Sequence, residues 1–291
     1  MKVKLLDHKE ISFPSGSGIE FHEEKIYLVG DDAKEILVLN KNWKELDRIS
    51  VFESSTDRIA KDLKADMEAT TIVEINKIPR LLVLGSGSMV PHRNRAFLFN
   101  LDDKTREEFP IDIFYNRLKN NGLADLNIES ASIILGKLVL GNRGNISSPS
   151  NYLITADINV WKDQENEEIR ILPFVYPQGS PDFAGLSGMT YSPQNDWLII
   201  TLSTENTKDS VNDGKIGDSY LGVIENASSK MVRKKIKIDE LINLSDVDDT
   251  FRRNKIESVC IQSDKDAKVK LHLVADNDNG QSVLFKIRLK E

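Results

Sequence analysis

Cysteine and histidine are both scarce in this chain of 291 residues. The single cysteine, Cys260, excludes an internal disulfide bond. Its place in the apolar run "SVCIQ" favours a buried, unreactive thiol over a nucleophile. The four histidines are scattered along the chain, so a zinc site built from histidine and cysteine ligands is not expected.

Long apolar runs and a basic charge balance are also missing. No segment approaches the ~20 apolar residues of a membrane-spanning helix. The N-terminus, "MKVKLLDHKEISFPSG", lacks the apolar core of a signal peptide, which predicts a cytoplasmic protein, or a periplasmic or secreted one if a leader was removed. A net charge of −7 argues against nucleic-acid binding, and we expect a soluble monomer without nucleic-acid or membrane partners.

A short motif occurs five times, each time at the start of a strand-like apolar run. It combines an apolar residue, a polar residue and a small residue, and its copies are "GSGIEF" (16–21), "DMEATT" (66–71), "NIESAS" (127–132), "GLSGMT" (185–190) and "KIESVC" (255–260). The polar positions, about 50 to 70 residues apart, are Ser17, Glu68, Glu129, Ser187 and Glu257.

Further strand-like runs follow each motif in the same order. In the first unit they are "IYLVG" (26–30), "ILVLN" (36–40) and the more polar, alternating "ELDRISV" (45–51). Apolar inner strands must be covered on both faces, whereas an alternating outer strand has one wet face. Four strands per unit, graded from apolar to polar and repeated five times, predict an all-β, five-bladed β-propeller with four-stranded blades.

The last unit lacks its fourth strand, and the N-terminal segment 2–11 can supply it. We therefore predict one domain over residues 1–291 whose ring is closed by the N-terminal strand joining the last blade. The expected blades are 14–55, 64–112, 126–176, 184–239 and 254–291 together with 1–13. The run "VRKKIKI" (232–238) is expected as the outer strand of the fourth blade, and surface helices are expected in 112–122 and 238–250.

The five polar positions should meet on the propeller axis, because the innermost strands line it. Three facing carboxylates repel one another unless a cation joins them. Oxygen ligands at irregular angles suit Ca²⁺, so we predict a Ca²⁺ site formed by Ser17, Glu68, Glu129, Ser187 and Glu257. The alternative is that these glutamates bind backbone N–H groups or water in the channel.

The chain resembles the calcium-activated nucleotidases, or apyrases, a family of five-bladed propellers. The order Ser, Glu, Glu, Ser, Glu matches that family's axial calcium ligands, and "LKADME" (63–68), "IESAS" (128–132) and "STEN" (203–206) look like its motifs. The resemblance implies that Arg143, in "LGNRGN" (140–145), binds nucleotide phosphates. A weaker resemblance, to phytase-like and esterase-like bacterial propellers, rests on "IES" and "NRGN".

Two functions remain open. The first is a calcium-dependent phosphohydrolase for a small phosphorylated molecule, a nucleotide or another ester or anhydride, in which Asp31, Asp32 and Glu205 are candidate general bases or outer metal ligands. The second is a non-catalytic, metal-stabilised propeller that binds a small ligand or a protein. The loop "HRNR" (92–95) could bind an anion at the mouth of the ring, although a solvated loop is the preferred interpretation.

Overall fold

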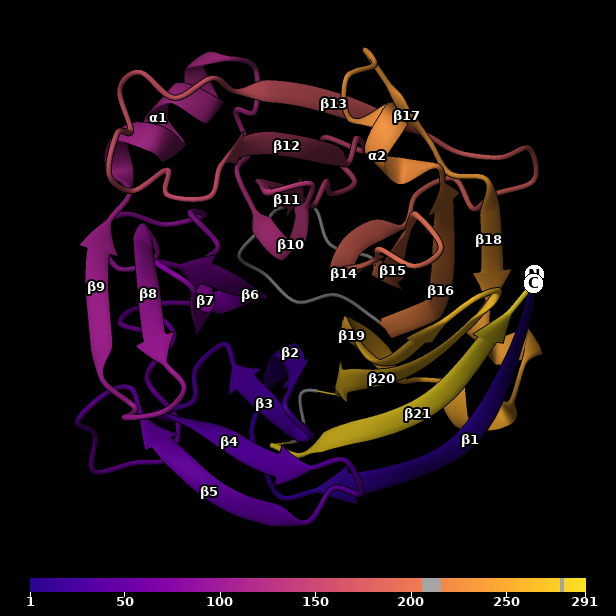
Figure 1. Ribbon diagram of the computed structural model, residues 1–291, viewed down its shortest axis with the longest axis horizontal. Helices are drawn as coiled ribbons and strands as arrows, with labels where there is room; N and C mark the ends of the chain where they lie inside the picture. The colour runs from indigo at the N-terminus through magenta and orange to yellow at the C-terminus, as the bar shows by residue number, and fades with distance from the viewer. Residues whose placement is uncertain (206–215, 278–279) are drawn as a thin grey trace.

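Five small antiparallel sheets surround a central axis in the computed structural model, which describes residues 1–205, 216–277 and 280–291 (Figure 1). Each sheet is one blade, and its strands follow one another outward from the axis. This arrangement confirms the predicted five-bladed β-propeller.

The blades share one pattern of four strands, ordered from the axis outward. Blade 1 contains β2 (Gly16–His22), β3 (Lys25–Gly30), β4 (Glu35–Asn40) and β5 (Glu45–Ser50); blade 2 contains β6 (Met67–Ile75), β7 (Ile78–Gly85), β8 (Arg95–Asn100) and β9 (Arg106–Pro110); blade 3 contains β10 (Ile128–Ile134), β11 (Lys137–Asn142), β12 (Tyr152–Asp157) and β13 (Arg170–Val175); blade 4 contains β14 (Gly185–Ser192), β15 (Trp197–Glu205), β16 (Ile216–Glu225) and β18 (Glu240–Asn243); blade 5 contains β19 (Lys255–Lys265), β20 (Lys268–Asp276), β21 (Ser282–Lys290) and β1 (Lys2–Ile11).

The ring is closed by β1, which pairs antiparallel with β21. Their register runs from Lys2 opposite Lys290 to Ile11 opposite Ser282. The first strand of the chain therefore completes the last blade, as predicted. Closure of this kind removes the free strand edges that an open ring would leave.

Apolar side chains fill the wedges between neighbouring blades. Each of the five hydrophobic clusters draws on two adjacent blades, so every interface has its own core. Cys260 lies in the wedge between blades 5 and 1, and burial raises the pKa of its thiol, which confirms the buried cysteine.

None of the helices in the described part of the chain is long and apolar enough to cross a membrane.

The helix predicted in 112–122 is present as α1 (Asp112–Asn120), but it is more than a surface insertion. Phe114, Tyr115 and Leu118 are buried in the wedge between blades 2 and 3. The hydroxyl of Tyr115 donates a hydrogen bond to the carbonyl of Gly85 at 2.6 Å. The helix therefore fills core space that the strands leave open.

The prediction for the outer strand of blade 4 was wrong. Residues 227–230 form a short helix, α2 (Ala227–Lys230), and β17 (Ile236–Lys237) pairs in parallel with β13 of blade 3. Ile236 and Ile238 are fully buried between blades 3 and 4. The alternation therefore marks a buried face, but the strand pairs with blade 3 instead of blade 4. In 238–250 the structure has β18 and two 3₁₀ turns, η1 (Leu244–Asp246) and η2 (Asp249–Phe251), rather than an α-helix.

Candidate metal centre

Each inner strand contains a β-bulge at the polar position of the repeated motif. In blade 1, Gly16 and Gly18 oppose the consecutive residues Gly30 and Val29, which leaves Ser17 as the extra residue. The same shift occurs at Glu68, Glu129, Ser187 and Glu257. A bulge redirects the side chain of the extra residue, so the five predicted positions are equivalent in the backbone.

The two bulged serines form hydrogen bonds between blades. Ser17 Oγ donates to the carbonyl of Met67 at 2.5 Å, and Ser187 Oγ donates to the carbonyl of Ile256 at 2.7 Å. Each acceptor residue directly precedes the bulged glutamate of the next blade. The serines therefore tie blade 1 to blade 2 and blade 4 to blade 5.

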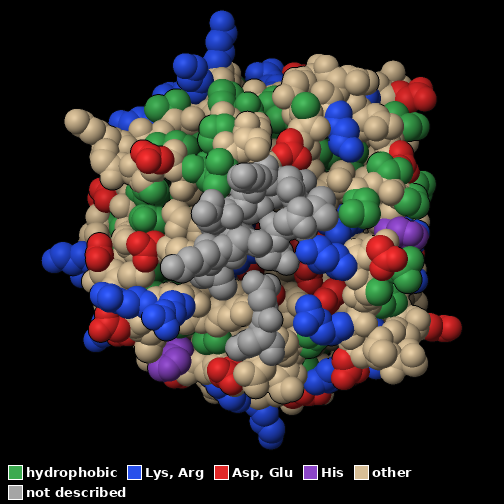
Figure 2. Space-filling view, turned by 180° about the vertical axis from the view of Figure 1, so that it is seen from behind, with side chains coloured by type: hydrophobic (Ala, Val, Ile, Leu, Met, Phe, Trp, Pro, Cys, Tyr) green, Lys and Arg blue, Asp and Glu red, His purple; other side chains and the backbone are tan. Residues whose placement is uncertain are grey.

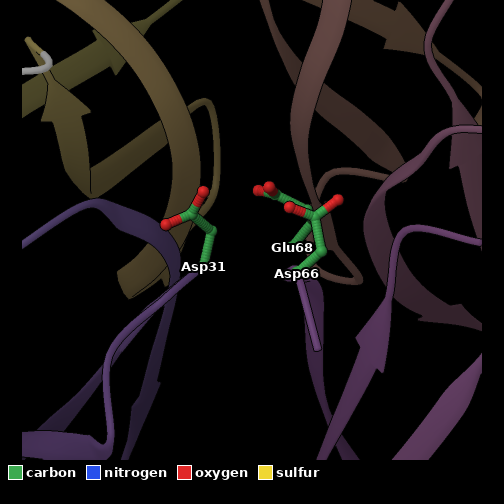
Figure 3. A group of neighbouring side chains, drawn as sticks. All are labelled: Asp31, Asp66 and Glu68. Atoms are coloured by element: carbon green, nitrogen blue, oxygen red, sulfur yellow. The ribbon is translucent and has the colours of Figure 1, made fainter. Parts of the chain in front are cut away.

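Three acidic side chains from blades 1 and 2 converge at the mouth of the axis. Asp31, Asp66 and Glu68 each place a carboxylate oxygen within 4.8 Å of the others. Figure 3 shows Asp31 on one side of this gap and Asp66 and Glu68 on the other. These three residues could hold a metal ion. Asp31 and Glu68 were site candidates from the sequence, whereas Asp66 was not.

Backbone hydrogen bonds fix Asp31 between the two blades. Its amide donates to the carbonyl of Ser15 at 3.0 Å, and its carbonyl accepts from the amide of Met67 at 3.3 Å. Asp66 has φ = 54°, a left-handed conformation that aspartate tolerates better than most residues. The acidic group is therefore built into the junction of blades 1 and 2.

Two basic side chains satisfy only part of the acidic group. Lys64 binds both Asp31 and Asp66, at 2.8 Å from Asp66 Oδ1, and Arg93 Nη1 lies 2.7 Å from Asp66 Oδ2. Asp31 Oδ1 is buried without a hydrogen-bond partner. The side chain of Glu68 forms no hydrogen bond or ion pair with any residue in the described ranges. Two of the three carboxylates thus present oxygens that the neighbouring protein groups do not satisfy.

The ionisation of the three carboxyls follows from these contacts. Burial raises the pKa of Glu68 well above its usual value, and the charges of Glu129, Asp66 and Asp31 raise it further. Burial also raises the pKa of Asp31 to about 6, although Lys64 opposes the shift. Burial acts on Asp66 in the same direction, but Lys64 and Arg93 outweigh it and its pKa is lowered. Positive charge is therefore deficient around Glu68 and Asp31.

The other two bulged glutamates have cationic partners. Glu129 Oε2 lies 3.8 Å from Arg143 Nη1, and its Oε1 accepts a 2.6 Å hydrogen bond from Asn127 Nδ2. Burial raises the pKa of Glu129 to about 7, with Arg143 opposing. Glu257 Oε1 lies 3.0 Å from Lys255 Nζ. Blades 3 and 5 thus contribute ion pairs to the same ring of bulges.

Arg143 occupies the position in blade 3 that Asp31 occupies in blade 1. Its amide donates to the carbonyl of Asn127 at 2.8 Å, as Asp31 does to Ser15, so both lie at the same end of the ring. A Cβ at Gly185 would come within 2.6 Å of Arg143 Nε. Glycine at the start of β14 therefore leaves the space in which the guanidinium lies.

Asp32, another predicted catalytic candidate, is not one of the three grouped carboxylates. Asp32 Oδ2 pairs with Arg58 Nε at 2.8 Å. Glu205 ends β15, and its side chain lies outside the described residues. Figure 2, which views the ring from behind, shows acidic and basic side chains beside one another near its centre.

Several residues of the site were missed from the sequence, namely Lys64, Asp66 and Lys255. Asp66 and Lys255 each stand two residues before a bulged glutamate, so an alignment of that position across the five motifs would have drawn attention to them. The loop "HRNR" is not a solvated loop, because Arg93 is only 2% exposed and pairs with Asp66.

The family model described as "Family of unknown function (DUF6929)" matches residues 12–289, which include the inner strands of all five blades. The chain belongs to this family. No curated protein matches this DUF6929 chain in sequence.

Solved structures that share the fold of the DUF6929 chain include two that it matches over nearly its whole length. Glutaminyl cyclase from Myxococcus xanthus is 9% identical with a TM-score of 0.57, and the match covers 99% of this chain and 96% of that one. The tail fibre of Staphylococcus aureus phage P68 is 10% identical with a TM-score of 0.52, covering 100% of this chain and 53% of that one. At these identities the likeness is one of fold.

Proposed function

We propose that this DUF6929 protein is a Ca²⁺-dependent phosphohydrolase that acts on a small phosphorylated molecule, a nucleotide or another phosphate ester or anhydride, at the mouth of the propeller axis. One observation carries the proposal. Carboxylates with unsatisfied oxygens and a buried arginine lie at the same end of one ring of β-bulges. A metal cation and an arginine can each stabilise the charge that develops on a phosphoryl group during its transfer.

The donor set suits a hard cation. Asp31, Asp66 and Glu68 offer only oxygen atoms, and Asp31 Oδ1 and the Glu68 carboxylate accept no hydrogen bond from the described residues. Ca²⁺ accepts carboxylates at irregular angles together with backbone carbonyls and water. Lys64 pairs with both Asp31 and Asp66, and Arg93 pairs with Asp66, so these two cations hold Asp66 in place. A bound Ca²⁺ would polarise a phosphoryl oxygen and help to orient water.

The cationic side chains would bind the phosphate. The guanidinium of Arg143 can donate two parallel hydrogen bonds to phosphate oxygens and offset the charge that develops on the transferred group. Glu129, which accepts a hydrogen bond from Asn127, forms an ion pair with that guanidinium. Lys255 adds a second positive charge beside Glu257. Asp32 and Glu205 remain candidates for the general base.

The test is a turnover assay with nucleoside triphosphates, nucleoside diphosphates and p-nitrophenyl phosphate, in Ca²⁺ and in excess EGTA. We expect hydrolysis that EGTA abolishes and that Glu68→Gln reduces strongly. Glu107→Gln is the matched control, because Glu107 is an exposed carboxylate on β9 that pairs with Arg80. Hydrolysis that persists in EGTA, or no hydrolysis of any of these compounds, would contradict the proposal.

A second candidate is a non-catalytic propeller in which the cation joins blades 1 and 2 and the loops bind a ligand. It is favoured by the bonds between blades that Ser17 and Ser187 make, since they show that some of the bulged residues hold the ring together. This candidate predicts that Ca²⁺ stabilises the fold while the substrate panel shows no turnover.

A further inference from the structure

A pocket opens at the end of the ring opposite the axial mouth. Strand β10 runs away from the mouth and ends at Ile134, and α2 follows the far end of β16. Between them lies a cavity of about 240 Å³. Its apolar lining comes from Ile134, Leu135, Val139, Ala156, Met231 and Val232. Figure 1 shows α2 and β17 beside β12 and β13 of blade 3.

Leu135 stands where a leucine is unfavourable. With φ = 48° it forms, together with Gly136 at φ = 75°, the two-residue turn between β10 and β11. Such turns favour Asn-Gly, and the corresponding turns of blades 1 and 2 hold Glu23–Glu24 and Asn76–Lys77. The side chain is also 76% exposed, so it gains almost no burial within the fold. Leu135 thus combines an unfavourable backbone conformation with an exposed apolar side chain. At the rim of a pocket, such a residue is typical of one that contacts a binding partner.

A second exposed apolar residue leads into a basic segment. Val232 is 71% exposed, and Arg233, Lys234, Lys235 and Lys237 are exposed beside it. None of these four basic residues forms an ion pair with a residue in the described ranges. The protein carries a net charge of −7, so a cluster of unpaired positive charge is a local exception. Charge complementarity points to an acidic partner.

We propose that this far-end pocket docks an acidic peptide segment of a partner protein. The peptide inserts one large apolar side chain into the cavity and places its carboxylates against Arg233, Lys234 and Lys235. The volume suffices, because an apolar cavity of roughly 150 Å³ accepts a benzene ring. A membrane surface fits less well, since the apolar residues line a cavity that a single side chain can fill. The inference does not depend on the proposed hydrolase.

The test is fluorescence anisotropy with the intact protein and a labelled twelve-residue peptide of Glu and Asp that carries one central Phe. We expect saturable binding, and binding about tenfold weaker when Ala replaces the Phe, because burial of the ring is lost. Vesicles with 30% phosphatidylserine are the competing probe. Equal binding of the Phe and Ala peptides, or binding of vesicles without binding of the peptide, would overturn the proposal.

Two variants separate docking from folding. Leu135→Asn should weaken the Phe peptide several-fold while leaving the melting temperature unchanged or higher, because asparagine suits the left-handed turn position. The double variant Lys234→Glu, Lys235→Glu should weaken both peptides, since it reverses exposed charges that pair with nothing in the described ranges. If both variants fold and bind the Phe peptide as the wild type does, the proposed docking surface is wrong.

Discussion

The bulged residues of the five inner strands divide into two groups with different neighbours. In blades 1 and 4 the residue is a serine, and its hydroxyl donates to a carbonyl of the next blade. In blades 2, 3 and 5 it is a glutamate that faces other charged groups. The backbone irregularity is the same in all five blades. What differs is whether the side chain holds the ring together or contributes charge to its mouth.

The three glutamates differ again among themselves. Glu129 and Glu257 each form an ion pair, with Arg143 and Lys255, whereas Glu68 forms none in the described ranges and lies with Asp31 and Asp66. In the proposed function, this contrast would place the cation beside blades 1 and 2 and a bound phosphate beside blades 3 and 5.

The largest expected effect is that of Arg143→Ala on turnover. Loss of a donor that stabilises developing charge should lower kcat by on the order of a hundredfold. The Ca²⁺-dependent rise in melting temperature should remain, because Arg143 pairs with Glu129 and is not one of the three grouped carboxylates. Both are measured on the same preparation, with EGTA as the blank. Undiminished hydrolysis in Arg143→Ala would contradict the phosphate-binding role proposed for Arg143.

As the pH falls, the carboxyls at the axial mouth and His272 should change the free energy of unfolding in opposite directions. His272 is a fully buried residue outside the mouth. Trp43 Nε1 donates to His272 Nδ1 at 3.1 Å, and burial, with Lys286 and Lys270, lowers the pKa of His272 to about 3. The folded pKa lies below the unfolded value of about 6.5. The stability that neutral His272 confers is therefore complete above pH 6.5 and is lost as the pH falls toward 3. Protonation at the mouth instead relieves repulsion between carboxylates.

The variant His272→Gln isolates this contribution, because its amide oxygen can still accept from Trp43 but does not titrate. Between pH 7 and pH 5 the free energy of unfolding should fall by about 2 kcal/mol less in the variant than in the wild type. Urea unfolding at the two pH values measures the difference. Equal losses would show that His272 is not the residue that titrates.

The smallest expected effect concerns the serine group. Ser187→Ala should lower the free energy of unfolding by about 1 kcal/mol, since the buried carbonyl of Ile256 loses its donor. It should leave the response to Ca²⁺ unchanged. Ser55→Ala, at an exposed serine, is the control. A Ser187→Ala protein that no longer responds to Ca²⁺ would place that serine among the metal ligands and erase the division between the two groups.

The fold could be predicted from the sequence because its signals are local and repeated. A polar residue inside an apolar run marks the bulge in each blade, and the spacing of Ser17, Glu68 and their equivalents counts the blades. The missing strand after β21 identifies the role of residues 2–11. The outer strand of blade 4 could not be found in this way. Alternation in 232–238 reports one buried face, but it does not report which blade supplies the partner strand.

The site was predictable only in part. Glu68 and Asp31 stand out as acidic residues beside apolar strands, yet their grouping with Asp66 depends on how blade 1 packs against blade 2. Arg93 reaches Asp66 from a loop 27 residues further along the chain. Contacts of this kind depend on three-dimensional packing, so residue type and spacing alone do not reveal them.

Thermal unfolding across a Ca²⁺ titration tests the central claim most directly, with wild type, Glu68→Gln and Glu129→Gln compared. A cation that binds only the folded state should stabilise the wild type by about 2.7 kcal/mol at a hundred times its Kd. Glu68→Gln should lose most of this stabilisation, whereas Glu129→Gln should keep most of it. No shift in the wild type at millimolar Ca²⁺, or equal losses in the two variants, would contradict a cation held between blades 1 and 2.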